Sequence, residues 1–122
     1  MTDPTVQGLN VRKTFGTREV LHPMSFEVAP GDVIGVLGKN GAGKTTLLEL
    51  VLGFAAPSGG QVRVFGHESY RLPGEIKSRV GFVPQQDELL DQLTVAAQLR
   101  VIAGFYSGWD SALVDQLCAE WM

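Results

Sequence analysis

The sequence predicts an α/β protein with a β-rich first two-thirds and a helical last third. Five segments with strand patterns lie before Gln85, and apolar residues recur at helical spacing beyond it. The 122 residues, 44% of them hydrophobic, are enough for one domain with its own core. Eight of the 15 glycines lie between Gly31 and Gly60. The backbone there is expected to adopt conformations that other residues avoid.

Three strands and a helix are expected in the first half of the chain. The patterns of Val6–Arg12 and Met24–Val28 each predict a strand. Asp32–Leu37 has almost no polar face, which is typical of a central strand buried on both sides. Lys44–Phe54 predicts an amphipathic helix whose apolar stripe consists of Leu47, Leu48, Val51 and Leu52.

The second half begins with strands and continues with helices. The alternation in Gln61–Phe65 predicts a strand after a turn, and Pro73–Arg79 predicts a short helix. Val80–Val83 is expected to form a second buried strand. Thr94 is placed to cap a helix that runs to about Phe105.

A last helix is expected after Asp110, which is placed to cap it. Its apolar stripe consists of Leu113, Val114, Leu117, Cys118 and Trp121. The helical pattern runs to Met122 with no glycine and no basic last turn. The sequence therefore predicts a domain that is cut short.

Composition excludes several classes of protein. The net charge of −3 gives no support to nucleic-acid binding, and the single Cys118 rules out a disulfide framework. No apolar stretch approaches the ~20 residues that span a bilayer, so direct membrane insertion is not expected. The N-terminus lacks the pattern of a signal peptide. We expect a cytoplasmic protein, at most peripheral to a membrane.

The segment Gly38–Thr45 reads GKNGAGKT and matches the phosphate-binding pattern G-x-x-x-x-G-K-[ST]. Glycines allow successive backbone N–H groups to point inward and cradle phosphate oxygens. The expected helix adds its positive N-terminal end to that cradle. In this pattern Lys44 reaches the β- and γ-phosphates, and the Thr45 hydroxyl is placed to ligate Mg²⁺. An apolar segment before the loop and an amphipathic helix after it fit the same interpretation.

With its flanks, this loop resembles the nucleotide-binding domain of ATP-binding-cassette (ABC) transporters. The similarity is carried by VIGVLGKNGAGKTTLLELVLGFAAPSGGQVRVFG and by RVGFVPQQDELLDQLTVAAQL, and it covers about residues 5 to 105. The resemblance implies a P-loop NTPase fold of the α/β class. It implies an incomplete ATP-binding core in residues 1–86 and the start of a helical subdomain in residues 87–122.

The resemblance also implies ATP and Mg²⁺ as cofactors and assigns residues to them. Nucleotide contacts fall on one aromatic residue, the loop and the first helical turn: Phe15, Gly38, Lys39, Asn40, Gly41, Ala42, Gly43, Lys44, Thr45 and Thr46. Phe15 stands where the family stacks an aromatic ring, more often tyrosine, on adenine. Gln85 matches the family's loop glutamine. Thr45 and Gln85 are the implied Mg²⁺ contacts, and Lys44 and Gln85 the implied catalytic residues. A transmembrane permease subunit and a second nucleotide-binding domain are the implied partners.

Other motifs that hydrolysis requires in this family are missing from the sequence. No apolar strand ends in Asp-Glu, no LSGGQ-like signature opens a helix, and no histidine follows them. Ser58–Gln61 spells SGGQ but precedes a strand, so a turn is expected there. We therefore expect the chain as given to bind nucleotide without hydrolysing it, although its family is one of ATPases.

Two alternatives differ in class. A small P-loop kinase or GTPase is disfavoured because 37 residues precede the loop and no Asn-Lys-x-Asp string occurs. A non-catalytic nucleotide-binding or interaction module stays open.

Overall fold

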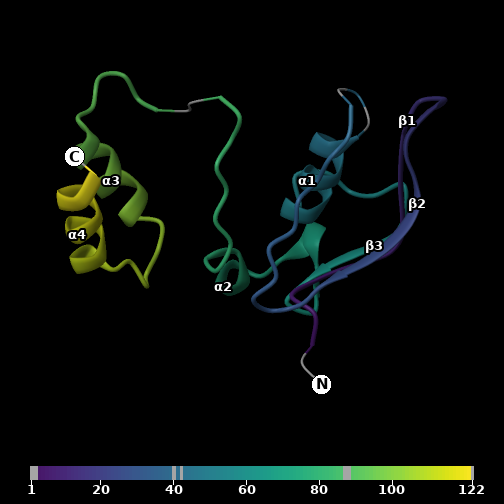
Figure 1. Ribbon diagram of the computed structural model, residues 1–122, viewed down its shortest axis with the longest axis horizontal. Coiled ribbons are helices and arrows are strands. Elements are labelled where there is room, and N and C mark those ends of the chain that lie inside the picture. Colours follow the sequence, from purple (N-terminus) through teal and green to yellow (C-terminus); the bar gives the residue numbers. More distant parts are fainter. Residues whose placement is uncertain (1–2, 40, 42, 87–88, 122) are drawn as a thin grey trace. The chain divides into compact units, whose positions relative to one another are not determined.

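The computed structural model describes residues 3–39, 41, 43–86 and 89–121 (Figure 1). The chain divides into two compact units, Met1–Arg79 and Val80–Met122. The functional boundary expected from the sequence lies after residue 86, within the second unit. Each unit is described separately below.

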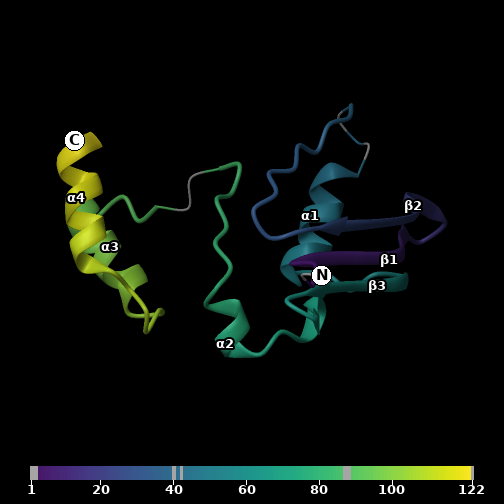
Figure 2. The same cartoon turned by 60° about the horizontal axis from the view of Figure 1, so that its bottom comes forward.

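The first unit contains an antiparallel sheet with the strand order β2-β1-β3-β4. Its strands are β1 (Val6–Phe15), β2 (Arg18–Val28), β3 (Gly59–Val64) and β4 (His67–Glu68). Figure 2 shows β2, β1 and β3 side by side. The three strands expected at Val6–Arg12, Met24–Val28 and Gln61–Phe65 are confirmed, the first two longer than expected. The two-residue β4 was not expected.

Strands β1 and β2 form a hairpin in which Val6 pairs with Val28 at one end and Phe15 pairs with Arg18 at the other. Gly16 lies in the turn at φ +63, a conformation that glycine adopts without steric cost. Residues directly opposite each other in an antiparallel pair project from the same face of the sheet. The hairpin therefore places Phe15 and Arg18 next to each other at the end of the sheet.

Helix α1 (Lys44–Leu52) covers one face of the sheet (Figures 1 and 2), with contacts to β2 and β3. The helix expected at Lys44–Phe54 is confirmed, and it ends where Gly53 adopts φ +79. The core of the unit consists of Val11, Leu21, Leu50 and Val62. Two short helical turns follow the sheet: η1 (Ser69–Arg71) and α2 (Gly74–Lys77).

The second unit contains two helices, α3 (Val95–Ala103) and α4 (Ser111–Trp121). The Thr94 hydroxyl accepts a hydrogen bond from the Ala97 amide at 3.1 Å, which confirms the expected cap. The Asp110 carboxylate accepts one from the Leu113 amide at 2.9 Å and caps α4 in the same way. Both helix starts were therefore predicted correctly from the capping residues.

Two strand predictions are wrong. Asp32–Leu37 and Val80–Val83 have no regular secondary structure, and their apolar side chains are largely exposed. Val33 is 98% exposed, Leu37 93% and Val83 91%. A strand buried on both sides needs hydrogen-bonded neighbours, and the part of the chain that the structure describes pairs neither segment with a strand.

Candidate functional site

The glycine-rich loop enters α1 through backbone conformations that favour glycine. Gly41 has φ +85 and Gly43 has φ +97. A Cβ atom at Gly43 would lie 2.8 Å from a methyl carbon of Leu21 and 3.1 Å from the Val20 carbonyl oxygen. Gly43 is therefore required both by its backbone conformation and by the close packing of the loop against β2.

The first turn of α1 presents its backbone and two polar side chains at the end of this loop. Gly43 is the N-cap, and no side chain caps the helix at this end. A helix N-terminus of this kind leaves N–H groups available to an anion. Lys44 is half-buried, and its ammonium donates a hydrogen bond to the Gly38 carbonyl oxygen. Thr45 is exposed, so its hydroxyl is accessible from the loop side.

A cavity of about 360 Å³ lies against the start of α1 and the end of the β1–β2 hairpin. Its lining residues are Phe15, Arg18, Val20, Gly41, Gly43, Lys44, Thr45 and Thr46. The volume falls within the range of about 300–1,000 Å³ that small-molecule sites occupy. Five residues of the expected loop and first turn thus meet Phe15, which is remote in sequence.

Phe15 is 52% exposed, so its ring is accessible beside the cavity. The Lys13 ammonium lies 5.2 Å from the ring centroid and also donates a hydrogen bond to the Ala56 carbonyl oxygen at 2.6 Å. These two contacts hold a cation over the ring.

The remaining expected site residues lie elsewhere. Gly38 and Lys39 are exposed and do not line the cavity. Gln85 is exposed in the second unit, on a bend after Pro84. Asn40 and Ala42 lie outside the described residues.

The sequence analysis did not identify two residues of the cavity wall, Arg18 and Val20. Both belong to β2, which was expected to begin at Met24. The pairing of Phe15 with Arg18 places Arg18 beside the ring, and the close approach of Gly43 to Val20 brings this end of β2 to the loop. The signal was available in the sequence, because Gly16 follows the aromatic residue and predicts a tight turn there.

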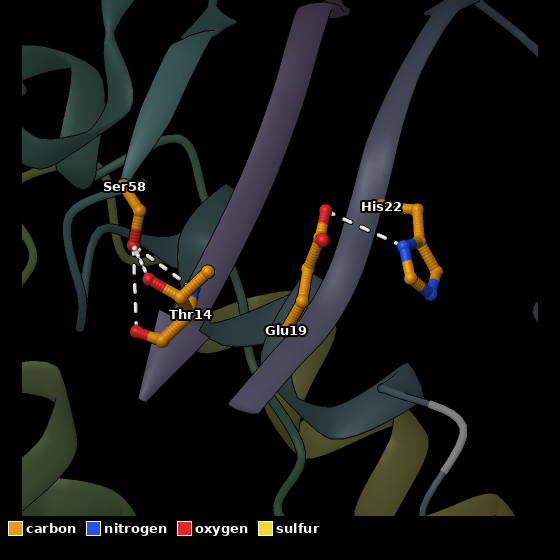
Figure 3. A network of polar contacts seen from close by, with 4 residues as sticks. All are labelled: Thr14, Glu19, His22 and Ser58. Atoms are coloured by element: carbon orange, nitrogen blue, oxygen red, sulfur yellow. Dashed lines mark hydrogen bonds and ion pairs between the residues drawn. The ribbon is translucent and has the colours of Figure 1, made fainter. Parts of the chain in front are cut away.

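Ser58–Gln61 forms the entry to β3 and does not open a helix. The Ser58 hydroxyl oxygen accepts hydrogen bonds from the Thr14 amide at 2.9 Å and the Thr14 hydroxyl at 3.3 Å (Figure 3). These bonds join the start of β3 to the end of β1. On β2, the Glu19 carboxylate oxygen Oε1 and the His22 Nδ1 atom lie 3.3 Å apart at the surface (Figure 3). The SGGQ string opens no helix, as expected, but Gly59–Gln61 belong to β3 and not to the expected turn.

The described residues contain no cluster of three or more His, Cys, Asp or Glu side chains that could hold a metal ion. A magnesium ion bound with a nucleotide does not need such a cluster. It keeps several waters and takes one or two protein ligands together with phosphate oxygens. The exposed Thr45 hydroxyl, on the wall of a cavity without a carboxylate, fits one such ligand position.

A glycine-rich loop that leads into a helix N-terminus with a lysine and a threonine in its first turn defines the P-loop NTPase class. The chain belongs to the ABC transporter family, since a family model of that description matches residues 21–121. Among the residues that the structure describes, no helix has the length and apolar character of a membrane span.

Relatives and solved structures agree with this assignment. Nod factor export ATP-binding protein I of Paraburkholderia xenovorans (strain LB400) is 42% identical over 112 residues, which are 92% of this chain and 36% of the relative. A structure described as the ATP binding subunit of an ABC transporter has a TM-score of 0.78 and 24% identity, covering 92% of this chain and 46% of that one. A bacterial Atm1-family ABC exporter with ATP bound has a TM-score of 0.63 and 33% identity, covering 72% of this chain and 16% of that one. The chain thus spans about a third of the length of the curated relatives it matches.

Proposed function

We propose that this chain binds ATP or ADP with Mg²⁺ in the cavity between the β1–β2 hairpin and the start of α1. The observation that carries the proposal is the meeting of Phe15 with Lys44, Thr45 and Thr46 around one cavity. An aromatic ring is suited to a purine base, and a lysine at a helix N-terminus is suited to phosphates. The residues Gly38–Thr46 and Phe15 are the proposed nucleotide contacts.

Each proposed contact has a physical role. The ring of Phe15 stacks on adenine, and the loop N–H groups and Lys44 neutralise the phosphate charge. Lys44 exchanges its hydrogen bond with the Gly38 carbonyl for charge-assisted bonds to phosphate oxygens, which are stronger. Thr45 would hold Mg²⁺ through its hydroxyl, and the ion would help to neutralise the charge of the phosphates. Gln85 is proposed as a second contact to the metal or to water, brought to the nucleotide in the complete protein.

We further propose that the chain by itself does not hydrolyse ATP. Phosphoryl transfer to water needs a group that orients or activates the water and charges that stabilise the transferred group. Lys44 supplies one such charge. The sequence offers no apolar strand ending in Asp-Glu and no helix-opening signature. Loss of a general base lowers rates by about 10²–10⁴-fold.

The function of the complete protein is proposed from the family. It is an ATP-binding subunit that couples ATP hydrolysis to transport, at the cytoplasmic side of a membrane, with a permease subunit and a second nucleotide-binding domain as partners. Residues 1–86 are then part of the ATP-binding core, and residues 87–122 begin a helical subdomain. The two relatives from Paraburkholderia xenovorans and Cupriavidus metallidurans are both named Nod factor export ATP-binding protein I.

Calorimetric titration of the full 122-residue chain with MgATP tests the binding proposal. Replacing Lys44 with alanine removes a charge-assisted contact of about 1.5–3 kcal/mol, so affinity falls about ten- to a hundredfold. The matched control is Lys77→Ala, which removes an exposed lysine of α2 outside the cavity. Equal affinities of the Lys44 variant and the unmodified chain would refute the site.

A phosphate-release assay tests the second proposal, with Lys44→Ala as the control for contaminating ATPases. We expect turnover well below the 1–10³ s⁻¹ that is typical of enzymes. Turnover above about 0.1 s⁻¹ that disappears in the Lys44 variant contradicts it. In that case a carboxylate of this chain serves as the base.

A further inference from the structure

Arg18 is the second cationic side chain on the wall of the cavity, and no sequence motif assigns it a role. It is the first residue of β2 and the register partner of Phe15. Its position is set by the hairpin and not by the phosphate loop. The same turn that presents the aromatic ring therefore also presents a guanidinium.

The charges on the cavity wall favour an anion with several negative groups. Of the eight lining residues, Arg18 and Lys44 are positive and none is acidic. Asn40 and Ala42, which complete the loop in the sequence, are uncharged. A base or a sugar alone leaves both positive charges unmatched, whereas a phosphate chain matches them.

Arg18 also differs from the other cation near the Phe15 ring. The Lys13 ammonium is engaged by the Ala56 carbonyl oxygen at 2.6 Å. Within the part of the chain that the structure describes, no hydrogen bond or ion pair involves the Arg18 guanidinium. The carboxylate of the neighbouring residue Glu19 lies 3.3 Å from the Nδ1 atom of His22. The guanidinium fork is thus available to a ligand, and its geometry suits two phosphate oxygens.

We propose that Arg18 binds the phosphate chain of the nucleotide, on the side nearer the base. This inference rests on the proposed function, because it requires the nucleotide to occupy the cavity with its base at Phe15. Lys44 and the N-terminus of α1 then hold the terminal phosphates, and Arg18 holds the phosphate that follows the ribose. The residue gives the site a preference for ligands that carry a phosphate chain over a base or a nucleoside alone.

The test compares MgATP with inorganic tripolyphosphate, which has the phosphates without base or ribose. Both are titrated as competitors of a fluorescent ATP analogue on the full chain, so that weak binding is measurable. Arg18→Gln is expected to lower the affinity for both ligands by a similar factor, about three- to tenfold, because the contact is solvent-accessible. Arg18→Lys keeps the positive charge but lacks the forked guanidinium. We therefore expect its affinities to lie between those of Arg18→Gln and those of the unmodified chain. Arg71→Gln removes an exposed arginine outside the cavity and is expected to change neither affinity.

The possible outcomes separate this inference from the proposed function. A loss for ATP without a loss for tripolyphosphate overturns it, because Arg18 then contacts the base or the ribose. No loss for either ligand, while Lys44→Ala weakens both, overturns it and leaves the nucleotide site intact. Failure of tripolyphosphate to compete while ATP binds also overturns it. Failure of the unmodified chain to bind ATP overturns the inference together with the proposed function. Circular dichroism spectra establish that each variant keeps the fold.

Discussion

Replacing Gly43 with alanine is expected to destabilise the first unit and to disturb the start of α1. Gly43 is buried and has φ +97, a conformation that costs a residue with a Cβ atom about 1–2 kcal/mol. The new Cβ lies 2.8 Å from a methyl carbon of Leu21 and 3.1 Å from the Val20 carbonyl oxygen. The Leu21 side chain belongs to the core, and the Val20 carbonyl oxygen belongs to the backbone of β2, so neither atom moves freely. Overpacking of this kind costs about 1–3 kcal/mol.

A matched control separates the two contributions. Gly31 has φ +86, and nothing lies within 4 Å of a Cβ built there. Gly31→Ala therefore retains the conformational cost and lacks the crowding. Alanine also lowers the conformational entropy of the unfolded chain, which stabilises the folded state by about 0.4–1 kcal/mol at either position. We expect a net loss of about 1–5 kcal/mol for Gly43→Ala, which exceeds the loss for Gly31→Ala by about 1–3 kcal/mol.

Urea unfolding followed by far-ultraviolet circular dichroism measures the difference. Tryptophan fluorescence is unsuitable, because Trp109 and Trp121 both belong to the second unit. Similar losses for the two variants, within about 0.5 kcal/mol, would refute the argument from crowding. Affinity for MgATP gives a second readout, since a shifted N-cap displaces Lys44 and Thr45. We expect Gly43→Ala to weaken binding more than Gly31→Ala does.

Three further predictions concern the core, a helix cap and the unpaired segments. Leu50→Ala removes a fully buried side chain and is expected to lower the free energy of unfolding in urea by about 2–5 kcal/mol. Leu48→Ala, at a 46% exposed position, is expected to lower it much less. Equal losses of stability in the two variants contradict the packing of α1. Thr94→Ala is expected to destabilise α3 by about 0.5–2 kcal/mol, measured by tryptophan fluorescence of the second unit, and Thr94→Ser restores most of the loss. Hydrogen exchange at residues 33–37 is expected to be fast, in contrast to protected amides in β1; strong protection in both refutes the unpaired state.

Local signals predicted most of the elements correctly. The caps at Thr94 and Asp110 depend on residues within one helical turn, so the sequence alone contains the information. The stripe expected for α1 was only partly right, because Leu48 is 46% exposed and the fully buried residue is Leu50. The hairpin was predicted only in part, because β2 begins with the polar residues Arg18 and Glu19 and its first half, up to Pro23, does not alternate. The error at Asp32–Leu37 has a different origin. The apolar residues of this segment suit a strand in a buried sheet, but a strand exists only where neighbouring strands are present to hydrogen-bond to it.

The candidate site shows the same division between local and distant information. The loop and the first turn of α1 were read from one motif, and Gly43 has the backbone that the motif requires. Arg18 was missed because its relation to the loop depends on strand pairing and not on spacing in sequence. The roles of Phe15 and Gln85 came from the family resemblance and stay predictions.

The proposed nucleotide site has two parts, the cavity and Gln85, and different contacts hold each part in place. The cavity belongs wholly to the first unit, and the hairpin and α1 that form it are joined by the core of Val11, Leu21, Leu50 and Val62. Gln85 belongs to the second unit and follows Val80–Val83, a segment without a strand partner among the described residues. Binding of the phosphates therefore needs only contacts within one packed unit. Any step that uses Gln85 needs that segment to be fixed first, and we therefore expect this chain to bind nucleotide without hydrolysing it.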